Sequence, residues 1–437
     1  MTGRKNTSSR FAVRGWRLAA GRAAFAAVCS LLLAVLIPFK SYGQKSATVE
    51  FSCKKYPFVH EDRNEIVSAR VLDSFFHKLY LQKTKNNQRI NILQIGDSHI
   101  QADFLSAQVR TDFQTDFGNA GRGVVVPLHV AGSNEPFNYK ITSNVACNSK
   151  RCVFVDRSMP IGIGGVTVTT TDESISFRIK TFDYPPLNYG FNKVTLFYQK
   201  DSSFDFHFED TLGNRLATIK SGEVEEYPNV STVQLPQPTN DVILKADKNA
   251  AYQNNATIFG LNLENDSSGV IFSAVGVNGA EAYQYVHAAY FAEETQVIQP
   301  DLILISLGTN EGQKIPLDKD LTRNRFDSLV RQLRTYNPST PIIITTPPDS
   351  YSRKKYYNPS IAAVHALLVE YAKENHIAVW DLFSATGGYK SCYQWRKYGL
   401  MRKDGVHFSR AGYEFQGNLF YEAIIKAYNN YVGRKHS

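Results

Sequence analysis

The sequence predicts an α/β protein built on a parallel sheet, with a long all-β segment inserted into it. Short apolar runs alternate with helical stretches near the start of the chain and again in its last third. Such alternation is typical of a parallel sheet that helices cover on both faces. Between these regions, from about residue 131 to residue 270, short segments alternate apolar and polar residues without helical stretches. That pattern indicates a β-sandwich or jelly roll.

Each element follows from its local periodicity. The first α/β unit is predicted from a helical pattern over residues 64–83, a buried strand over 90–95 and a second helix over 100–113. The central segment has candidate strands at 165–170, 175–180, 193–198 and 204–208. In the last third, strands at 270–275, 301–306, 341–346 and 377–380 alternate with helices at 280–292, 322–335, 360–375 and 410–428. Functional residues in such sheets gather at the carboxyl ends of the strands.

The first 43 residues are predicted to be a targeting segment. They hold seven basic residues and no acid, and an uncharged apolar run extends from Ala23 to Phe39. This pattern indicates a cleaved secretory signal or, alternatively, an uncleaved N-terminal anchor. We therefore expect export to the periplasm, cell envelope or medium, with no membrane span after this segment. The predicted organisation is a signal peptide at 1–43, an α/β domain assembled from 44–130 and 271–437, and an inserted β-sandwich domain at 131–270.

Charge and cysteine content agree with an exported protein. The chain has 49 basic and 40 acidic residues, but seven of the basic ones lie in the targeting segment, so the remainder is nearly neutral and predicts no nucleic-acid partner. Four cysteines follow, and an even number favours two disulfides with three possible connectivities. The short loop between Cys147 and Cys152 makes them the preferred pair, which leaves Cys53 for Cys392. Buried thiols without a bridge are the alternative.

A serine stands where the first predicted strand gives way to a helix. Ser98 follows Gly96 and Asp97 at the end of the apolar run. A nucleophilic serine needs exposure above the sheet and nearby backbone N–H groups that can hold an oxyanion. A turn into a helix N-terminus provides both. The alternative is that Ser98 only caps the helix.

Two further sites near predicted strand ends carry polar residues suited to nucleophilic catalysis. Asn310 follows the strand at 301–306, where its amide is suited to donate to a developing negative charge or, alternatively, to form an Asx-turn. Asp404 precedes His407 by three residues, so its carboxylate is suited to receive the Nδ1–H and leave Nε2 as a general base. The alternatives are a turn at Asp404 and Gly405, or a metal site, for which no third ligand is indicated.

In this chain order the residues resemble the four blocks of the SGNH/GDSL hydrolase superfamily. Gly-Asp-Ser98 resembles the first block, Gly-Thr-Asn310 the third and Asp-Gly-Val-His407 the last. Gly279 lies 31 residues before Asn310, near the position of the glycine block. The chain lacks the Gly-x-Ser-x-Gly elbow of the α/β-hydrolases around Ser98. The resemblance implies a flavodoxin-like three-layer fold and a serine esterase.

The resemblance points to one group within the superfamily, because 181 residues separate Ser98 from Gly279. The arrangement is similar to bacterial peptidoglycan O-acetylesterases, which are exported and have a β-sandwich resembling carbohydrate-binding modules between the serine and glycine blocks. The strings Gly-Asp-Ser-His-Ile-Gln-Ala-Asp103 and Gly276-Val-Asn-Gly-Ala280 are similar to that group as well. The aromatic residues of the insertion are expected mainly in its core, with sugar stacking as the alternative: Tyr139, Phe182, Tyr184, Tyr189, Phe191 and Tyr198.

The resemblance implies a mechanism without a cofactor or metal. Ser98 attacks the acyl carbonyl, His407 takes its proton and Asp404 holds the imidazole. The oxyanion hole consists of the N–H groups of Ser98 and Gly279 and of the Asn310 side chain.

The expected substrate is an O-acetylated polysaccharide, and above all the O-acetyl groups of muramic acid in peptidoglycan. The alternatives are acetylated xylan or an exopolysaccharide, a GDSL lipase or acylhydrolase, and a non-catalytic wall-binding protein. The intact site residues argue against the last. His99 and Gln101 lie beside the nucleophile, where they either contact substrate or pack the helix.

Overall fold

The computed structural model describes residues 53–156 and 158–436. The targeting segment predicted at 1–43 lies outside the described residues. Within them, no helix combines the length and the apolar character that crossing a membrane requires.

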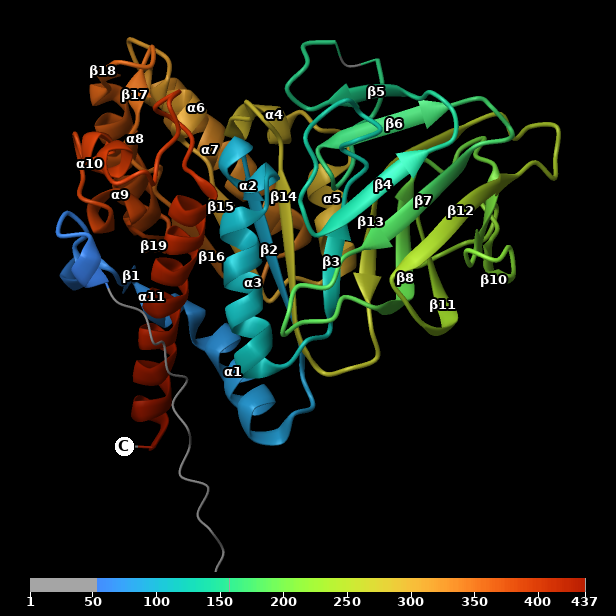
Figure 1. Cartoon of the computed structure of the whole chain (residues 1–437), viewed down its shortest axis with the longest axis horizontal. Coiled ribbons are helices and arrows are strands. Elements are labelled where there is room, and N and C mark those ends of the chain that lie inside the picture. Colours follow the sequence, from blue (N-terminus) through green and yellow to red (C-terminus); the bar gives the residue numbers. More distant parts are fainter. Residues whose placement is uncertain (1–52, 157, 437) are drawn as a thin grey trace, which may run out of the picture. The chain divides into compact units, whose positions relative to one another are not determined.

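A six-stranded sheet with the order β1-β19-β16-β15-β2-β14 forms the centre of the α/β part (Figure 1). Its strands are β1 (Ile66–Val67), β2 (Arg89–Gly96), β14 (Gly269–Gly276), β15 (Leu302–Ser306), β16 (Ile342–Thr345) and β19 (Ala378–Trp380). All pairs are parallel except the edge pair β1–β19. Leaving the edge strand β1 aside, the first strand in the chain, β2, lies between the second, β14, and the third, β15, which is the flavodoxin-like order. The direction of winding thus reverses at β2, and crevices at such reversals bind ligands.

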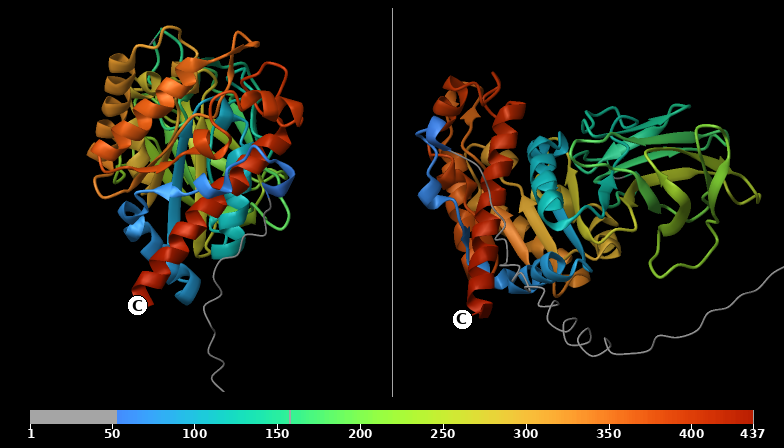
Figure 2. Two further views of the ribbon diagram at one scale, coloured as in Figure 1. Left: turned by 90° about the vertical axis from the view of Figure 1, so that its left-hand side faces the viewer. Right: turned by 60° about the horizontal axis from the view of Figure 1, so that its bottom comes forward.

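Helices cover both faces of this sheet (Figure 2). One face packs against α1 (Asp73–Lys85), α3 (Phe104–Phe117) and α11 (Arg410–His436), and the other against α4 (Ala282–Val286), α5 (Phe291–Thr295), α7 (Lys319–Tyr336) and α8 (Pro359–Glu374). Alternate strand residues serve the two cores: Leu302 and Leu304 belong to the first, Ile303 and Ile305 to the second. This explains why the strand reads as a continuous apolar run.

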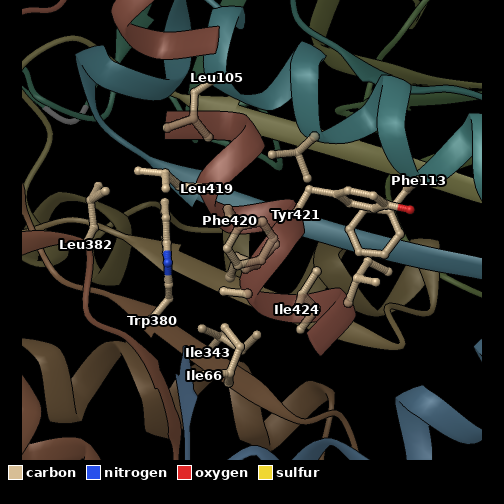
Figure 3. Packing of buried hydrophobic residues seen from close by; sticks show 14 of the residues in the cluster. Ile66, Leu105, Phe113, Ile343, Trp380, Leu382, Leu419, Phe420, Tyr421 and Ile424 are labelled. Carbon is tan, nitrogen blue, oxygen red and sulfur yellow. The ribbon is translucent and has the colours of Figure 1, made fainter. Parts of the chain in front are cut away.

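The first of these cores contains the large aromatic residues that fix α11 on the sheet. Figure 3 shows Phe420 and Ile424 of α11 close to Ile343 and Trp380 of the sheet. The rings of Trp380 and Phe420 meet edge to face, with centroids 5.0 Å apart. Burial of each such side chain contributes about 1.5–3 kcal/mol. The long C-terminal helix is therefore held by side chains along its length, and it follows the loop that carries His407.

Two antiparallel sheets make up the central part of the chain. The first has the order β10-β9-β12-β7-β4 and the second β11-β8-β13-β6-β5, with β3 also paired to β13. Their strands are β3 (Gly121–Val125), β4 (Tyr139–Ser143), β5 (Asn148–Arg151), β6 (Val166–Thr170), β7 (Ser176–Thr181), β8 (Phe191–Tyr198), β9 (Asp205–Glu209), β10 (Arg215–Ile219), β11 (Val230–Thr239), β12 (Asp241–Asp247) and β13 (Ala256–Glu264). Buried residues from both sheets form one shared core.

The second antiparallel sheet also packs against the α/β part. Phe197 of β8 and Phe259 of β13 belong to the same core as Phe291 of α5. The rings of Phe259 and Tyr290 lie 5.7 Å apart. The described residues accordingly form one compact unit. The parallel sheet with helices on both faces and the additional antiparallel sheets agree with the predicted fold class, whereas a separate inserted domain at 131–270 stays a prediction.

Three predicted helices differ from the observed elements. The helical pattern at 64–83 becomes a helix only at Asp73, because Ile66 and Val67 pair with β19 as an edge strand. The helix at 100–113 is divided into α2 (Ser98–Gln101) and α3 by Asp103, whose φ of 60° is left-handed. The helix at 280–292 is two short ones, α4 and α5. The spacing of apolar residues does not reveal such interruptions, because the chain continues to bury the same face on both sides of the break.

The remaining elements are short. They are the 3-10 turns η1 (Cys53–Lys55), η2 (Glu61–Arg63), η3 (Ala69–Leu72) and η4 (Gln296–Ile298), the helices α6 (Thr309–Gly312), α9 (Leu382–Ala385) and α10 (Cys392–Lys397), and the hairpin β17 (Tyr351–Ser352) and β18 (Tyr356–Tyr357).

The predicted disulfides are not formed. None of the four described cysteines is bridged to another. Cys147 and Cys152 stand at opposite ends of the extended strand β5, and five residue steps at about 3.3 Å place their backbones far beyond the roughly 7 Å that a disulfide tolerates. Cys53 and Cys392 are buried in the same apolar core without a bridge. The loop that was expected between Cys147 and Cys152 is a strand paired with β6.

Candidate active site

The structure brings together three side chains from distant parts of the chain. His407 Nε2 lies 2.9 Å from Ser98 Oγ, and His407 Nδ1 lies 3.2 Å from Asp404 Oδ2. These contacts fit the tautomer in which Nδ1 carries the proton, because Asp404 accepts it and Nε2 is left to accept from the serine hydroxyl. The arrangement is that of a nucleophile, a base and a group that orients the base.

Asp404 both makes a turn and faces the histidine. Its Oδ1 accepts the backbone N–H groups of Val406 (2.9 Å) and His407 (2.8 Å). Burial alone raises the pKa of Asp404, but these hydrogen bonds and the histidine outweigh it, and the pKa lies below its usual value. The turn and the contact with the histidine are thus not alternatives. The same turn fixes the carboxylate that orients the imidazole.

Ser98 is the first residue of α2, and the cap of that helix is its neighbour. The Asp97 carboxylate accepts the His99 N–H at 2.9 Å, as an N-cap does. The alternative that Ser98 caps the helix is therefore wrong. Its hydroxyl is left to face His407 at the carboxyl end of β2.

Gly279 lies in a tight turn after β14, the strand beside β2. The turn is closed by the Ala280 N–H, which donates to Val277 O at 2.9 Å. Gly279 has a φ of +83°, a conformation that glycine adopts without strain. No described atom lies within 4 Å of where its Cβ would be, so the turn requires glycine for its backbone and not for space.

Asn310, at the end of β15 on the other side of β2, has a different surrounding from the one predicted. Its amide nitrogen donates to Ala280 O at 2.9 Å and to Asp97 Oδ2 at 3.2 Å. Both amide hydrogens thus have protein partners. Donation to an oxyanion requires exchange of one of these bonds, and the one to Asp97 is the longer. Asp97 is fully buried, which raises its pKa to about 7.

Gln101 is a buried residue that joins three segments of the site. Its Oε1 accepts the Asn278 N–H at 2.7 Å, one residue before Gly279. Its Nε2 is 2.9 Å from Ser133 Oγ, 2.7 Å from Asn134 O and 2.9 Å from Asn134 Oδ1. Gln101 therefore holds the glycine turn and the β3–β4 connection against α2. Of the two predicted alternatives, substrate contact and packing, the structure shows packing.

His99 is buried as well. Its Nδ1 lies 3.0 Å from the Tyr413 hydroxyl. Burial and, secondarily, the nearby His407 lower the pKa of His99 to about 3, so the ring is neutral and does not compete as a base.

Asp103 anchors the segment that follows the candidate nucleophile. Its fully buried carboxylate binds the Arg110 guanidinium through both oxygens at 3.0 Å, Arg122 at 2.8 Å and the Asn138 amide at 2.6 Å. Burial raises its pKa, but the two guanidinium groups outweigh that and hold the pKa low. The cluster ties α3 to β3 and to the residue before β4. Its partners are 7, 19 and 35 residues away and carry no signal in the sequence.

The candidate catalytic residues line one cleft of about 960 Å³. Besides the five predicted residues, Ser98, Gly279, Asn310, Asp404 and His407, its walls hold residues that the sequence analysis missed: Phe104, Asn134, Glu135, Phe137, Gln313, Arg353, Lys354, Arg402 and Tyr413. The rings of Phe104 and Phe137 stack at 5.4 Å. Of the six aromatic residues predicted mainly in the core of the insertion, four are buried, namely Tyr139, Tyr189, Phe191 and Tyr198, whereas Phe182 is exposed and Tyr184 is half-buried.

Comparison with known proteins gives the class. Residues 240–415 match the model of the GDSL-like lipase/acylhydrolase family. The match includes Gly279, Asn310, Asp404 and His407, and the fold adds Ser98, which lies outside it. Residues 240–415 are therefore similar to the carboxylic ester hydrolases of the GDSL type, and the contacts of Ser98, His407 and Asp404 fit such an enzyme.

A solved structure agrees over most of the chain. A peptidoglycan O-acetylesterase is similar with a TM-score of 0.68 and 23% identity, covering 82% of this chain and 96% of the other. A lipase/acylhydrolase from Enterococcus faecalis (TM-score 0.30, 21% identity) covers 37% of this chain and 77% of its own. A carbohydrate esterase family 3 protein from Talaromyces cellulolyticus (TM-score 0.29, 20% identity) covers 37% and 72%. No curated protein sequence matches.

Proposed function

We propose that this protein is an exported O-acetylesterase that removes acetyl groups from carbohydrate, with the O-acetyl groups of muramic acid in peptidoglycan as its substrate. The observation that carries the proposal is the chain of contacts from Asp404 through His407 to Ser98 in an accessible cleft. The shared fold with a peptidoglycan O-acetylesterase, over nearly the whole of that chain, supports the choice of polymer.

The residues have defined parts in the proposed reaction. Ser98 Oγ attacks the acetyl carbonyl carbon while its proton passes to His407 Nε2, and Asp404 stabilises the imidazolium. The N–H groups of Ser98 and Gly279 and the Asn310 amide receive the oxyanion. The bond between the carbonyl carbon and the sugar oxygen then breaks, and His407 gives its proton to that oxygen. Water, deprotonated by His407, attacks the acetyl-enzyme, and His407 returns the proton to Ser98 Oγ as acetate leaves.

The cleft supports a carbohydrate ester over a long-chain lipid ester. Its wall carries polar and charged side chains around a limited apolar surface. A long acyl chain requires an extended apolar channel, because burial of its methylene groups supplies the affinity. The rings of Phe104 and Phe137, which stack on each other in the cleft wall, supply aromatic surface of the kind that packs against sugar rings.

The test measures acetate released by one preparation from O-acetylated peptidoglycan and from acetylated xylan. We expect release from peptidoglycan at the higher kcat/KM, and none above background from a Ser98→Ala preparation, which controls for contaminating esterases. Faster release of acetate from xylan would indicate that the substrate is a polysaccharide other than peptidoglycan. Preference for octanoyl over acetyl esters would move the protein to the lipases. Export is tested by fractionating the producing cells and sequencing the N-terminus of the mature protein.

A further inference from the structure

Three cations line the cleft beside the candidate catalytic histidine. Arg402 precedes Asp404 by two residues, and its N–H donates to His407 O at 2.8 Å. Arg353 and Lys354 come from the tip of the β17–β18 hairpin. All three are exposed and belong to the wall of the same cleft as Ser98.

No acid of the described residues forms an ion pair with any of these three side chains. Cations nearby behave differently: Lys314 and Arg325 both bind Glu281, at 2.6 and 3.0 Å. Asp404 and Glu135 are the acids in the cleft wall. Asp404 is held by His407, and Glu135 lies within 4 Å of both His129 and Lys140. Within the part of the chain that the structure describes, the positive charge at the histidine side of the cleft is therefore not neutralised by an ion pair.

The hairpin that carries two of the cations is fixed to the loop of the catalytic histidine. The Tyr351 N–H donates to Gly405 O at 2.8 Å, and Arg396 Nη2 donates to both Lys354 O (3.3 Å) and Lys403 O (3.1 Å). Arg353 and Lys354 themselves have left-handed φ values of 48° and 69°, which residues with a Cβ adopt only where the surroundings enforce them. The backbone that carries Arg353 and Lys354 is thus fixed relative to the loop of His407.

We propose that Arg353, Lys354 and Arg402 form a carboxylate-binding subsite, so that the preferred substrate carries a negative charge close to the acetylated sugar. The proposal rests on the proposed function and specifies its substrate: an acidic sugar polymer and not a neutral one. Guanidinium groups bind carboxylates through paired hydrogen bonds, and unneutralised cations in a cleft raise the local concentration of an anionic substrate.

The test compares two monosaccharides acetylated on the 6-hydroxyl, N-acetylmuramic acid and N-acetylglucosamine, which differ only in the carboxyl-bearing lactyl ether. We expect kcat/KM to be at least about tenfold higher for the muramic acid ester at low ionic strength, since charged clefts change association by about 10–10³. The ratio should fall as salt is raised, because exposed charges are screened. Equal kcat/KM values would overturn the proposal.

Two matched triple variants test whether the preference for the muramic acid ester depends on the three cations of the cleft wall. The triple variant Arg353→Gln, Lys354→Gln, Arg402→Gln should bring the ratio of the two kcat/KM values close to one. The control Lys355→Gln, Lys397→Gln, Lys403→Gln removes the same charge from exposed positions outside the cleft wall and should keep the ratio. A ratio lost equally in both triples would refute a local subsite. The comparison of the two esters with the unmodified protein tests the proposal even if a triple variant does not fold. Absence of hydrolysis of both esters would overturn the subsite, whereas absence of acetate release from O-acetylated peptidoglycan would refute the proposed function.

Discussion

Replacing Gln101 with leucine tests whether the turn of Gly279 must be held in place for catalysis. Leucine has a similar volume but offers no partner to the Asn278 N–H or to Ser133 and Asn134. A buried polar group left unpaired costs about 1–3 kcal/mol. Because Asn134 is exposed and water can replace its bonds, we expect a loss of about 2 kcal/mol in the free energy of unfolding.

The chain contains a matched control at the opposite end of the sheet. Gln82 is equally buried, and its Oε1 accepts the Gln88 N–H at 2.8 Å. Its Nε2 has three oxygen partners, on Asn86, Phe117 and Ser268. Gln82→Leu therefore removes the same kinds of bond and should cost similar stability. It leaves the glycine turn untouched.

The two variants should differ in turnover. Removal of a complete oxyanion donor lowers kcat about 10²–10³-fold. Displacement of the Gly279 N–H, which remains present, should therefore lower kcat about 10–100-fold, with a smaller change in KM. We expect this loss in Gln101→Leu and kcat within about twofold of the unmodified protein in Gln82→Leu. The assay is hydrolysis of 4-nitrophenyl acetate, with urea unfolding of the same samples. Similar kcat values in both variants, at similar stability, would refute the positioning role of Gln101.

Other predictions concern the triad and a buried acid. Ser98→Ala should reduce hydrolysis of 4-nitrophenyl acetate to background with an unchanged melting temperature, and activity within tenfold of the original would contradict its role as nucleophile. Asp404→Asn should lower kcat by up to about 10⁴, because an amide favours the wrong histidine tautomer; an unchanged kcat would show that Asp404 only forms the turn. Glu311 is buried, which raises its pKa to about 7, so the folded state keeps a proton that the unfolded chain releases near pH 4. The protonated Glu311 carboxyl thus makes its full contribution to the free energy of unfolding below about pH 4. This contribution is lost as the pH rises to 7, and the loss amounts to roughly 3 kcal/mol. Glu311→Gln lacks this dependence, so its unfolding free energy relative to that of the unmodified protein should rise by that amount between pH 4 and pH 7, as measured in urea; a constant difference would refute the titration of Glu311.

Much of the fold and of the site could be predicted from local patterns. The strands at 90–95, 270–275 and 301–306 are apolar because both faces are buried, and that property is visible in the sequence without knowledge of the partners. Parallel strands of one sheet present their carboxyl ends at the same edge. Residues that follow three such strands, Ser98, Gly279 and Asn310, therefore had to lie near one another once the strands were recognised.

Contacts between distant residues were decided only by the tertiary structure. The partners of Gln101 are 32, 33 and 177 residues away, and Asn310 is 213 residues from Asp97. The unpaired state of Arg353, Lys354 and Arg402 is likewise a property of what surrounds them. The prediction of disulfides was wrong for the same reason. The segment between Cys147 and Cys152 forms a strand because it pairs with β6, and that partner is not visible in the local sequence. Periodicity records how deeply a residue is buried, whereas the identity of its neighbour is set by the way the chain packs.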